Sequence, residues 1–465
     1  LFAPHVKWSA TARRVHDLVP LLERAFVESR AGVPGPVFLE CPVDLLYGEE
    51  LVRSWYGAAS KAKGLAGLGM RLYVQRHVDR LFAGRERTPK PSRPVSPPPV
   101  DRGEVRKAAA RLKKAKRPVL LLGSQAMLTP GEAGEVAQAV EAIGAPVYLA
   151  GMARGLLGAG HRLQLRHKRK EALREADLVV LAGIPADFRL DYGRHIGRRA
   201  HLVSVNRNRA DLEMNRKPDL PVHGDPGLFL RSLAAALSAG DRRGDRHWGE
   251  WLESLRARDA EREREIEAQA EVPPSQSDLV NPVHLCREIE RALGPESVIV
   301  ADGGDFVATA AYTLSPRGPL SWLDPGVFGT LGVGGGFALG AKLCRPEADV
   351  WVIYGDGSVA YSLAEFDTFA RHGVPVIAVV GNDAGWTQIA REQVEVLKDD
   401  VATVLARTDY HKVAEGYGGC GLLLSRPEEV RPVLEEAVRI ARAGAPVLVN
   451  ALIDRTEFRK GSISM

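Results

Sequence analysis

The sequence predicts an α/β protein whose parallel sheets are flanked by helices. Between residues 101 and 240, short apolar runs such as Pro118–Leu122 and Leu178–Ala182 alternate with stretches of helical period. The alternation returns after residue 276, with buried-strand patterns at 297–301, 349–354 and 375–380. Strands that alternate with helices form parallel sheets, and ligands bind at the carboxyl edge of such sheets.

The bulk composition is that of a globular enzyme. The 465 residues are 45% hydrophobic and 26% charged, which suggests about two to four domains. A nucleic-acid partner is not expected, because the net charge is only +5, aromatic residues are 6%, and no recognition motif accompanies the basic clusters. The four cysteines lie far apart without a CxxC pair, so neither a disulfide framework nor a zinc site is expected.

We expect five segments along the chain. They are a domain remnant at 1–50, a linker at 51–100, a Rossmann-like central domain at 101–240, a connecting helix at 241–275, and a last domain at 276–465. The first segment is expected to be only the end of a domain, because one helix near 20–29 and one strand cannot bury a core. Residues 51–100 are basic and end in a proline cluster, which is typical of a linker, with one helix at 71–82.

Two polar motifs follow neighbouring strands of the last domain. Gly355-Asp356-Gly357-Ser358 ends one strand, and Asn382-Asp383-Ala384-Gly385-Trp386 ends the next. Oxygens of Asp356, of Asp383 or Asn382, and of the Gly385 carbonyl would suit Mg²⁺, which takes its remaining ligands from phosphate and water. Gly355 and Gly357 would let backbone N–H groups approach a phosphate, and Ser358 would open a helix. The pair therefore predicts a site for a metal diphosphate.

The spacing of these motifs resembles that of the thiamin-diphosphate-dependent enzymes, the family of acetolactate synthase, oxalyl-CoA decarboxylase and 2-hydroxyacyl-CoA lyase. The run 381–388 is most similar to the animal 2-hydroxyacyl-CoA lyases. Most relatives have Asn-Asn where this chain has Asn382-Asp383; the family register favours Asp383 as the metal ligand, with Asn382 as the second choice. The resemblance implies three domains: a pyrimidine-binding domain, represented by 1–50, the central domain, and the diphosphate-binding domain at 276–465.

Further site residues follow from the resemblance. The segment Gly329-Thr330-Leu331 resembles the one that holds the cofactor bent, with Leu331 in the place of the apolar wedge between the two cofactor rings. The loop with Gly303, Gly304 and Asp305 is a further candidate cofactor contact, together with Trp386. On the substrate side, the candidates are Trp386, Gln388 and Tyr361, whose alternative role is loop packing.

No catalytic residue is expected within this chain. In the family a Glu of the pyrimidine-binding domain starts formation of the cofactor ylide, and no segment here matches its surroundings. We therefore expect that Glu in an N-terminal part that precedes this chain, and little activity from the chain alone. The resemblance also implies a homodimer or homotetramer, since the cofactor spans two subunits in relatives, and an endoplasmic-reticulum membrane protein anchored through an N-terminal segment.

The leading expectation for function is a thiamin-diphosphate- and Mg²⁺-dependent lyase that cleaves 2-hydroxyacyl-CoA to a shortened aldehyde and formyl-CoA, as in fatty acid α-oxidation. The alternative within the family is acetolactate synthesis from a 2-keto acid. Relatives use the central domain for FAD, for ADP or CoA, or for no ligand; Arg154, Arg189, Asn206 and Arg207 lie at strand ends there. Two other classes stay open: an inactive regulatory relative, and an oxidoreductase, against which the absence of GxGxxG counts.

Overall fold

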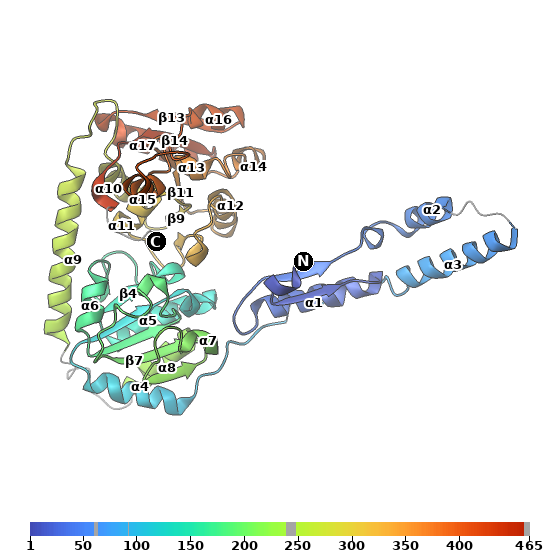
Figure 1. Ribbon diagram of the computed structural model, residues 1–465, viewed down its shortest axis with the longest axis horizontal. Coiled ribbons are helices and arrows are strands. Elements are labelled where there is room, and N and C mark those ends of the chain that lie inside the picture. Colours follow the sequence, from blue (N-terminus) through green and yellow to red (C-terminus); the bar gives the residue numbers. More distant parts are fainter. Residues whose placement is uncertain (60–63, 92, 239–247, 460–465) are drawn as a thin grey trace. The chain divides into compact units, whose positions relative to one another are not determined.

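The computed structural model describes residues 1–59, 64–91, 93–238 and 248–459 (Figure 1). Its contacts divide the chain into two compact units, Leu1–Pro98 and Pro99–Met465. Each unit is described by itself. Among the described residues, no helix combines the length and the apolar character needed to cross a membrane.

The first unit is a small α/β layer extended by two helices. Strand β1 (Trp8–Thr11) pairs in parallel with β2 (Val37–Glu40), and α1 (Val15–Arg30) connects them. Much of the segment expected as a linker, 51–100, is helical, since α2 (Glu49–Ala59) and α3 (Gly64–Phe82) occupy it. The one helix expected there, at 71–82, lies within α3. These helices fold because apolar side chains of both segments share one small core, made of Ala12, Leu45, Val52, Val78, Leu81 and Phe82. The helix expected near 20–29 begins earlier, at Val15, so that Pro20 lies inside α1.

The central part of the second unit contains a six-stranded parallel sheet of order β5-β4-β3-β6-β7-β8. Its strands are β3 (Pro118–Leu122), β4 (Val147–Leu149), β5 (Gln164–Leu165), β6 (Leu178–Ala182), β7 (His201–Asn206) and β8 (Leu220–His223). Its helices are α4 (Arg102–Lys114), α5 (Ala133–Ile143), α6 (Arg169–Glu175), α7 (Arg209–Leu212) and α8 (Pro226–Ser238). All residues of β3 and β6 are buried, as expected for a sheet with both faces covered.

A second six-stranded parallel sheet, of order β10-β9-β11-β12-β14-β13, lies in the last part of the chain. Its strands are β9 (Val298–Ala301), β10 (Trp322–Leu323), β11 (Val350–Gly355), β12 (Ile377–Asn382), β13 (Cys420–Leu424) and β14 (Val447–Leu452). Its helices are α10 (Pro282–Ala292), α11 (Asp305–Thr313), α12 (Gly334–Cys344), α13 (Asp356–Val359), α14 (Glu365–His372), α15 (Thr387–Leu397), α16 (Tyr410–Gly416) and α17 (Val430–Arg442).

Successive residues of β11 contribute to cores on opposite faces of this sheet. Trp351 and Ile353 join the apolar cluster that includes residues of α10 and α17. Val352 and Tyr354 join the cluster that includes residues of α12 and α14. This two-residue period follows from the pleat of a strand, and it holds the central strands rigidly between two helical layers.

Helix α9 (Gly249–Ala270) lies beside both sheets (Figure 1). Trp251 near its start packs in the core of the central sheet, whereas Ile266 near its end packs with Val283 of α10. The predicted connecting helix is thus present, although residues 241–247 of that segment lie outside the described part of the chain.

Candidate functional site

Three adjacent strands bring the polar motifs to one edge of the second sheet. Strand β11 lies between β9 and β12, so the loops that follow these strands are neighbours. The Gly355 N–H donates to the Gly303 carbonyl at 3.2 Å, and the Gly385 N–H donates to Asp356 Oδ2 at 3.0 Å. The loops 302–305, 355–358 and 383–386 therefore form one continuous surface at the carboxyl edge of the sheet.

The carboxylate of Asp356 is buried and oriented by the backbone. Only 2% of this residue is exposed. Oδ1 accepts from the Gly357 N–H at 2.7 Å and Oδ2 from the Gly385 N–H, while the Tyr410 hydroxyl donates to the Asp356 carbonyl at 3.0 Å. Burial raises the pKa of Asp356, although the backbone N–H groups of Gly385 and Gly357 oppose the shift. A nearby cation would stabilise such a carboxylate in its charged form.

The side chains of Asp383 and Asn382 have different surroundings. Burial raises the pKa of Asp383 to about 6, the Thr387 hydroxyl opposes the shift, and the charge of Asp356 adds to it. Asn382 instead donates to the Thr408 carbonyl and to Oδ1 of Asn450 on the neighbouring strand β14, both at 3.2 Å. Asp383, rather than Asn382, is thus electrostatically coupled to Asp356.

The donor set fits Mg²⁺ bound to a diphosphate. Asp356 is buried and Asp383 is half-buried, and the charge of Asp356 helps to raise the pKa of Asp383, so the pair is a favourable place for a divalent cation. The described residues contain no group of three or more His, Cys, Asp or Glu side chains that could hold a metal alone. Mg²⁺ commonly takes only one or two carboxylates and completes its shell with phosphate and water, so the assignment of Asp356 and Asp383 stays a prediction that this chemistry supports.

Ser358 and the helix expected after it differ from the sequence prediction. Helix α13 is a single turn from Asp356 to Val359, and the next helix, α14, begins only at Glu365. The Ser358 hydroxyl lies 3.1 Å from both the N–H and the carbonyl oxygen of Gly355. Ser358 therefore holds the turn of the Gly-Asp-Gly motif through the backbone of Gly355. A helix of one turn does not provide the dipole by which the N-terminus of a longer helix favours an anion.

Trp386 packs on Gly357. A Cβ atom on this glycine would lie 2.5 Å from the indole ring, so only glycine leaves room for it.

Gly385, in the loop that carries Trp386, also has a side chain close to it. A Cβ on Gly385 would lie 2.5 Å from Arg455 Nη2. Arg455 also donates to the carbonyls of Asp383, at 3.2 Å, and Ala384, at 2.8 Å. The sequence analysis missed Arg455, since no local pattern links it to a loop about 70 residues earlier.

The glycine-rich segment reaches the same edge. The side chain of Leu331 packs directly on Gly303, where a Cβ would collide with it. Gly329 and Thr330 are exposed beside it. Tyr361, 66% exposed, packs against Gly332 through its Cβ. Leu331 thus places this segment beside the loop of Gly303 and Gly304.

The remaining predicted residues surround the start of α15. Asp305 forms a two-bond ion pair with Arg391, with both distances 2.9 Å, which joins α15 to the start of α11. Gln388 is half-buried in the first turn of α15. The ion pair between Asp305 and Arg391 therefore positions α15.

The strand-end candidates of the central domain have protein partners. Arg207 forms a buried ion pair with Asp225 at 2.6 Å, and Asn206 accepts from Gln125 at 2.9 Å. Arg189 pairs with Asp187 at 2.6 Å.

Arg154 has its partners in the last domain. It lies 4.2 Å from the ring centre of Trp322 and donates to the Ala311 carbonyl. Arg154 thus contacts the last domain, whereas Arg189, Asn206 and Arg207 are engaged within the central domain.

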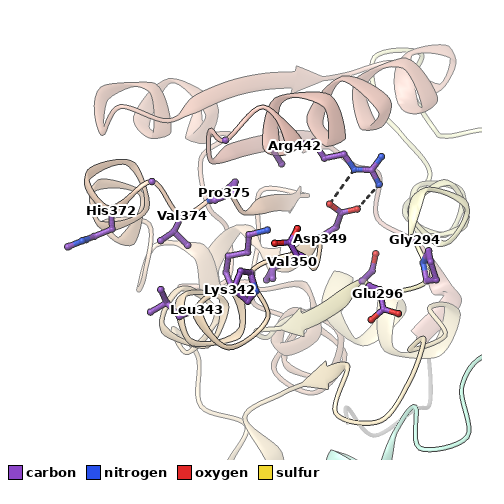
Figure 2. Close-up of a pocket in the computed structure, with 17 residues that line it drawn as sticks. Gly294, Glu296, Lys342, Leu343, Asp349, Val350, His372, Val374, Pro375 and Arg442 are labelled. Atoms are coloured by element: carbon purple, nitrogen blue, oxygen red, sulfur yellow. Dashed lines mark hydrogen bonds and ion pairs between the residues drawn. The ribbon is translucent and has the colours of Figure 1, made fainter.

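A separate hollow of about 620 Å³ lies at the amino edge of the second sheet (Figure 2). It is lined by both acidic and basic side chains, and Arg442 donates to Asp349 across it at 2.8 Å. None of the predicted site residues lines this hollow. The metal and glycine-rich motifs belong to the opposite edge.

Comparison with known proteins identifies the class. Residues 302–451 match the family described as "Thiamine pyrophosphate enzyme, C-terminal TPP binding domain", and residues 105–233 match "Thiamine pyrophosphate enzyme, central domain". The chain therefore belongs to the thiamin-diphosphate-dependent enzymes, and both the predicted family and the predicted fold class are confirmed.

Individual proteins of this family differ in how similar they are to the chain. The chain is 48% identical to 2-hydroxyacyl-CoA lyase 2 of Homo sapiens over 473 residues, which cover all of this chain and 74% of that protein. It is 46% identical to 2-hydroxyacyl-CoA lyase 2 of Danio rerio, with 100% and 75% coverage. The acetolactate synthase large subunit IlvG of Mycobacterium tuberculosis is 32% identical, with 97% and 74% coverage. The chain is thus more similar to these two lyases than to this synthase.

Proposed function

We propose that this protein cleaves a 2-hydroxyacyl-CoA between C1 and C2, giving formyl-CoA and an aldehyde one carbon shorter. The observation that carries the proposal is the convergence of Asp356, Asp383 and Leu331 at one sheet edge in a chain 48% identical to a 2-hydroxyacyl-CoA lyase. The cleavage needs no external oxidant, because the two products together contain the atoms and electrons of the substrate.

Thiamin diphosphate supplies the electron sink that cleavage beside a carbonyl requires. Asp356 and Asp383 would hold its Mg²⁺, and the Gly355–Gly357 turn would face the diphosphate. Leu331 would orient the two rings. The backbone N–H groups of Gly357 and Gly385 keep the Asp356 carboxylate in place, so this chain's part is to bind and orient the cofactor in a fixed geometry.

We also propose that the working protein is a homo-oligomer in which a second copy covers α15. None of the residues of α15 is buried. Ile389, Val396 and Leu397 are 55%, 75% and 64% exposed, yet the helix is fixed beside the site by the Arg391–Asp305 pair. Apolar surface beside a binding site is typical of a protein interface.

Acetolactate synthesis from pyruvate remains the second candidate, because the chain is 32% identical to the large subunit of an acetolactate synthase. The side chains of Arg207 and Asn206 do not support FAD binding in the central domain, because both already contact other protein side chains. A flavin-dependent synthase would give a yellow protein.

The test is a product assay with the full-length protein, thiamin diphosphate and Mg²⁺. A long-chain 2-hydroxyacyl-CoA and, separately, pyruvate are supplied, and products are identified by mass spectrometry. We expect the shortened aldehyde and formyl-CoA from the first substrate. Acetolactate from pyruvate without any aldehyde would overturn the lyase in favour of the synthase, and no product from either would support an inactive relative.

A further inference from the structure

Asp302 is a buried carboxylate at the end of β9 that the metal site does not use. It is 2% exposed, and its backbone N–H donates to the Ile353 carbonyl of β11 at 3.0 Å, which fixes its position at the sheet. Its two carboxylate oxygens accept from the glycine-rich segment: Oδ1 from the Gly332 N–H at 3.0 Å and Oδ2 from the Gly334 N–H at 2.6 Å. One side chain thus connects the rigid sheet with the segment that carries Leu331.

The geometry around these two bonds admits only glycine. Gly332 has φ +84, and a Cβ there would lie 2.6 Å from Tyr361 Cβ. A Cβ on Gly334 would lie 2.7 Å from the ring of Tyr354 and 2.9 Å from Asp302 Oδ2. The small residues let the segment approach the carboxylate closely enough for both N–H groups to reach it.

Leu331 sits next to this pair of bonds. Its side chain packs on Gly303, the residue directly after Asp302. Two sets of contacts therefore position the leucine. The hydrogen bonds from Gly332 and Gly334 to Asp302 hold the backbone that follows it, and Gly303 contacts its side chain. Any loosening of the Asp302 bonds would free the leucine to leave its place on Gly303.

We propose that Asp302 is a positioning residue that fixes Leu331 in the place where it orients the rings of the cofactor. The role toward the cofactor rests on the function proposed above, whereas the hydrogen-bonded clamp is a property of the chain itself. An ionised aspartate suits the role because it only accepts hydrogen bonds, and both of its oxygens face N–H donors. Asparagine has the same shape, but its NH₂ group, a donor, would face the N–H donor of either Gly332 or Gly334.

The first arm of the test follows the clamp in the cofactor-free, full-length protein. Hydrogen exchange of the Gly332 and Gly334 amides is measured in the wild type and in Asp302→Asn. We expect exchange at least about tenfold faster in the variant, since hydrogen bonds to charged groups contribute most. Asp367→Asn, which removes an exposed carboxylate paired with Arg371 on α14, should leave these amides unchanged. Equal protection in Asp302→Asn would overturn the clamp.

The second arm separates the cofactor rings from the diphosphate. Calorimetry compares binding of thiamin diphosphate with binding of pyrophosphate, both with Mg²⁺. We expect Asp302→Asn to weaken thiamin diphosphate at least about fivefold and to change pyrophosphate by less than about twofold, because Leu331 would contact only the rings. Equal weakening of both ligands would mean general disruption of the site and would overturn the positioning role.

A second variant keeps the inference testable if Asp302→Asn does not fold. Gly303→Ala leaves the carboxylate in place but puts a Cβ where Leu331 packs. It should reproduce the selective loss of thiamin diphosphate while the Gly332 amide stays protected. Lost protection in Asp302→Asn with unchanged binding of both ligands would instead contradict the role toward the cofactor and leave the clamp standing. Failure of the wild type to bind thiamin diphosphate at all would count against the proposed function.

Discussion

At the scale of single residues, the site is built from contacts between glycines and large side chains. Trp386 occupies the space beside Gly357, Arg455 that beside Gly385, and Leu331 that beside Gly303. A side chain in place of each glycine would therefore have to displace one of these neighbours.

The contact between Gly357 and Trp386 predicts the effect of one methyl group. In Gly357→Ala the new Cβ would lie 2.5 Å from the indole ring, so Trp386 must move, and we expect a loss of about 1–3 kcal/mol of unfolding free energy. Urea unfolding measures it. Gly336→Ala is the matched control: it is exposed in α12 with no atom within 4 Å of the new Cβ, and we expect it to be neutral or to stabilise by about 0.5–1 kcal/mol. Equal stability of the two variants would refute the packing role.

The spacing of the motifs predicted Asp356 and Asp383 at one edge, because a strand with a period of two residues and a short loop leave little freedom. Arg455 and Tyr410 were not predicted. They reach the site from segments that follow β14 and precede β13, and their contacts depend on how distant strands are ordered in the sheet. Local patterns carry no information on such partners.

At the scale of elements, α9 joins the two sheets through a charged cluster around Glu263. His167 and Arg166, which lie between β5 and α6, contact Glu263 Oε1 at 2.7 and 3.3 Å, and Arg287 of α10 contacts Oε2 at 2.7 Å. Burial alone would raise the pKa of Glu263, but these partners lower it to about 2. The charged form of Glu263 therefore favours the folded protein.

This shift predicts how stability depends on pH. Because the folded pKa is below the ordinary value of 4.5, the contribution of Glu263 is complete above that pH and is lost as the pH falls toward about 2. The wild type should be more stable than Glu263→Gln near pH 6, with a difference that shrinks between pH 4.5 and 2. Urea unfolding across this range measures it, and Glu261→Gln on the same helix controls for loss of a surface charge. A difference that is independent of pH would contradict the assignment.

The strands β3, β6 and β11 were predictable because each is a continuous apolar run that the sheet buries on both faces. Helix α9 was predictable from its acid-base pairs at helical spacing. The failures have physical causes. Helix α2 and the first turns of α3 were missed, whereas the helix expected at 71–82 lies within α3. The missed turns belong to a core that these helices share with Ala12 and Leu45, which no local pattern reveals. The helix expected from Ser358 onward is split, since α13 ends after one turn and α14 starts at Glu365.

At the scale of the whole molecule, the apolar surface of α15 predicts self-association. A double substitution, Ile389→Lys with Val396→Glu, places charges on this exposed face, and we expect it to shift the full-length protein toward the monomer in analytical ultracentrifugation. Val272→Glu, at a residue 56% exposed and outside α15, is the control. An unchanged sedimentation profile of the double variant would place the interface elsewhere.

We propose that the edge formed by Asp356 and Asp383 binds thiamin diphosphate through Mg²⁺. Calorimetric titration of the full-length protein with thiamin diphosphate tests it most directly, with Mg²⁺ or with a chelator, for the wild type and Asp356→Asn. We expect saturable binding of the wild type only with Mg²⁺, and binding at least about tenfold weaker in Asp356→Asn, because a metal-ligating carboxylate is lost. Binding of equal strength with the chelator, or in Asp356→Asn, would contradict the account.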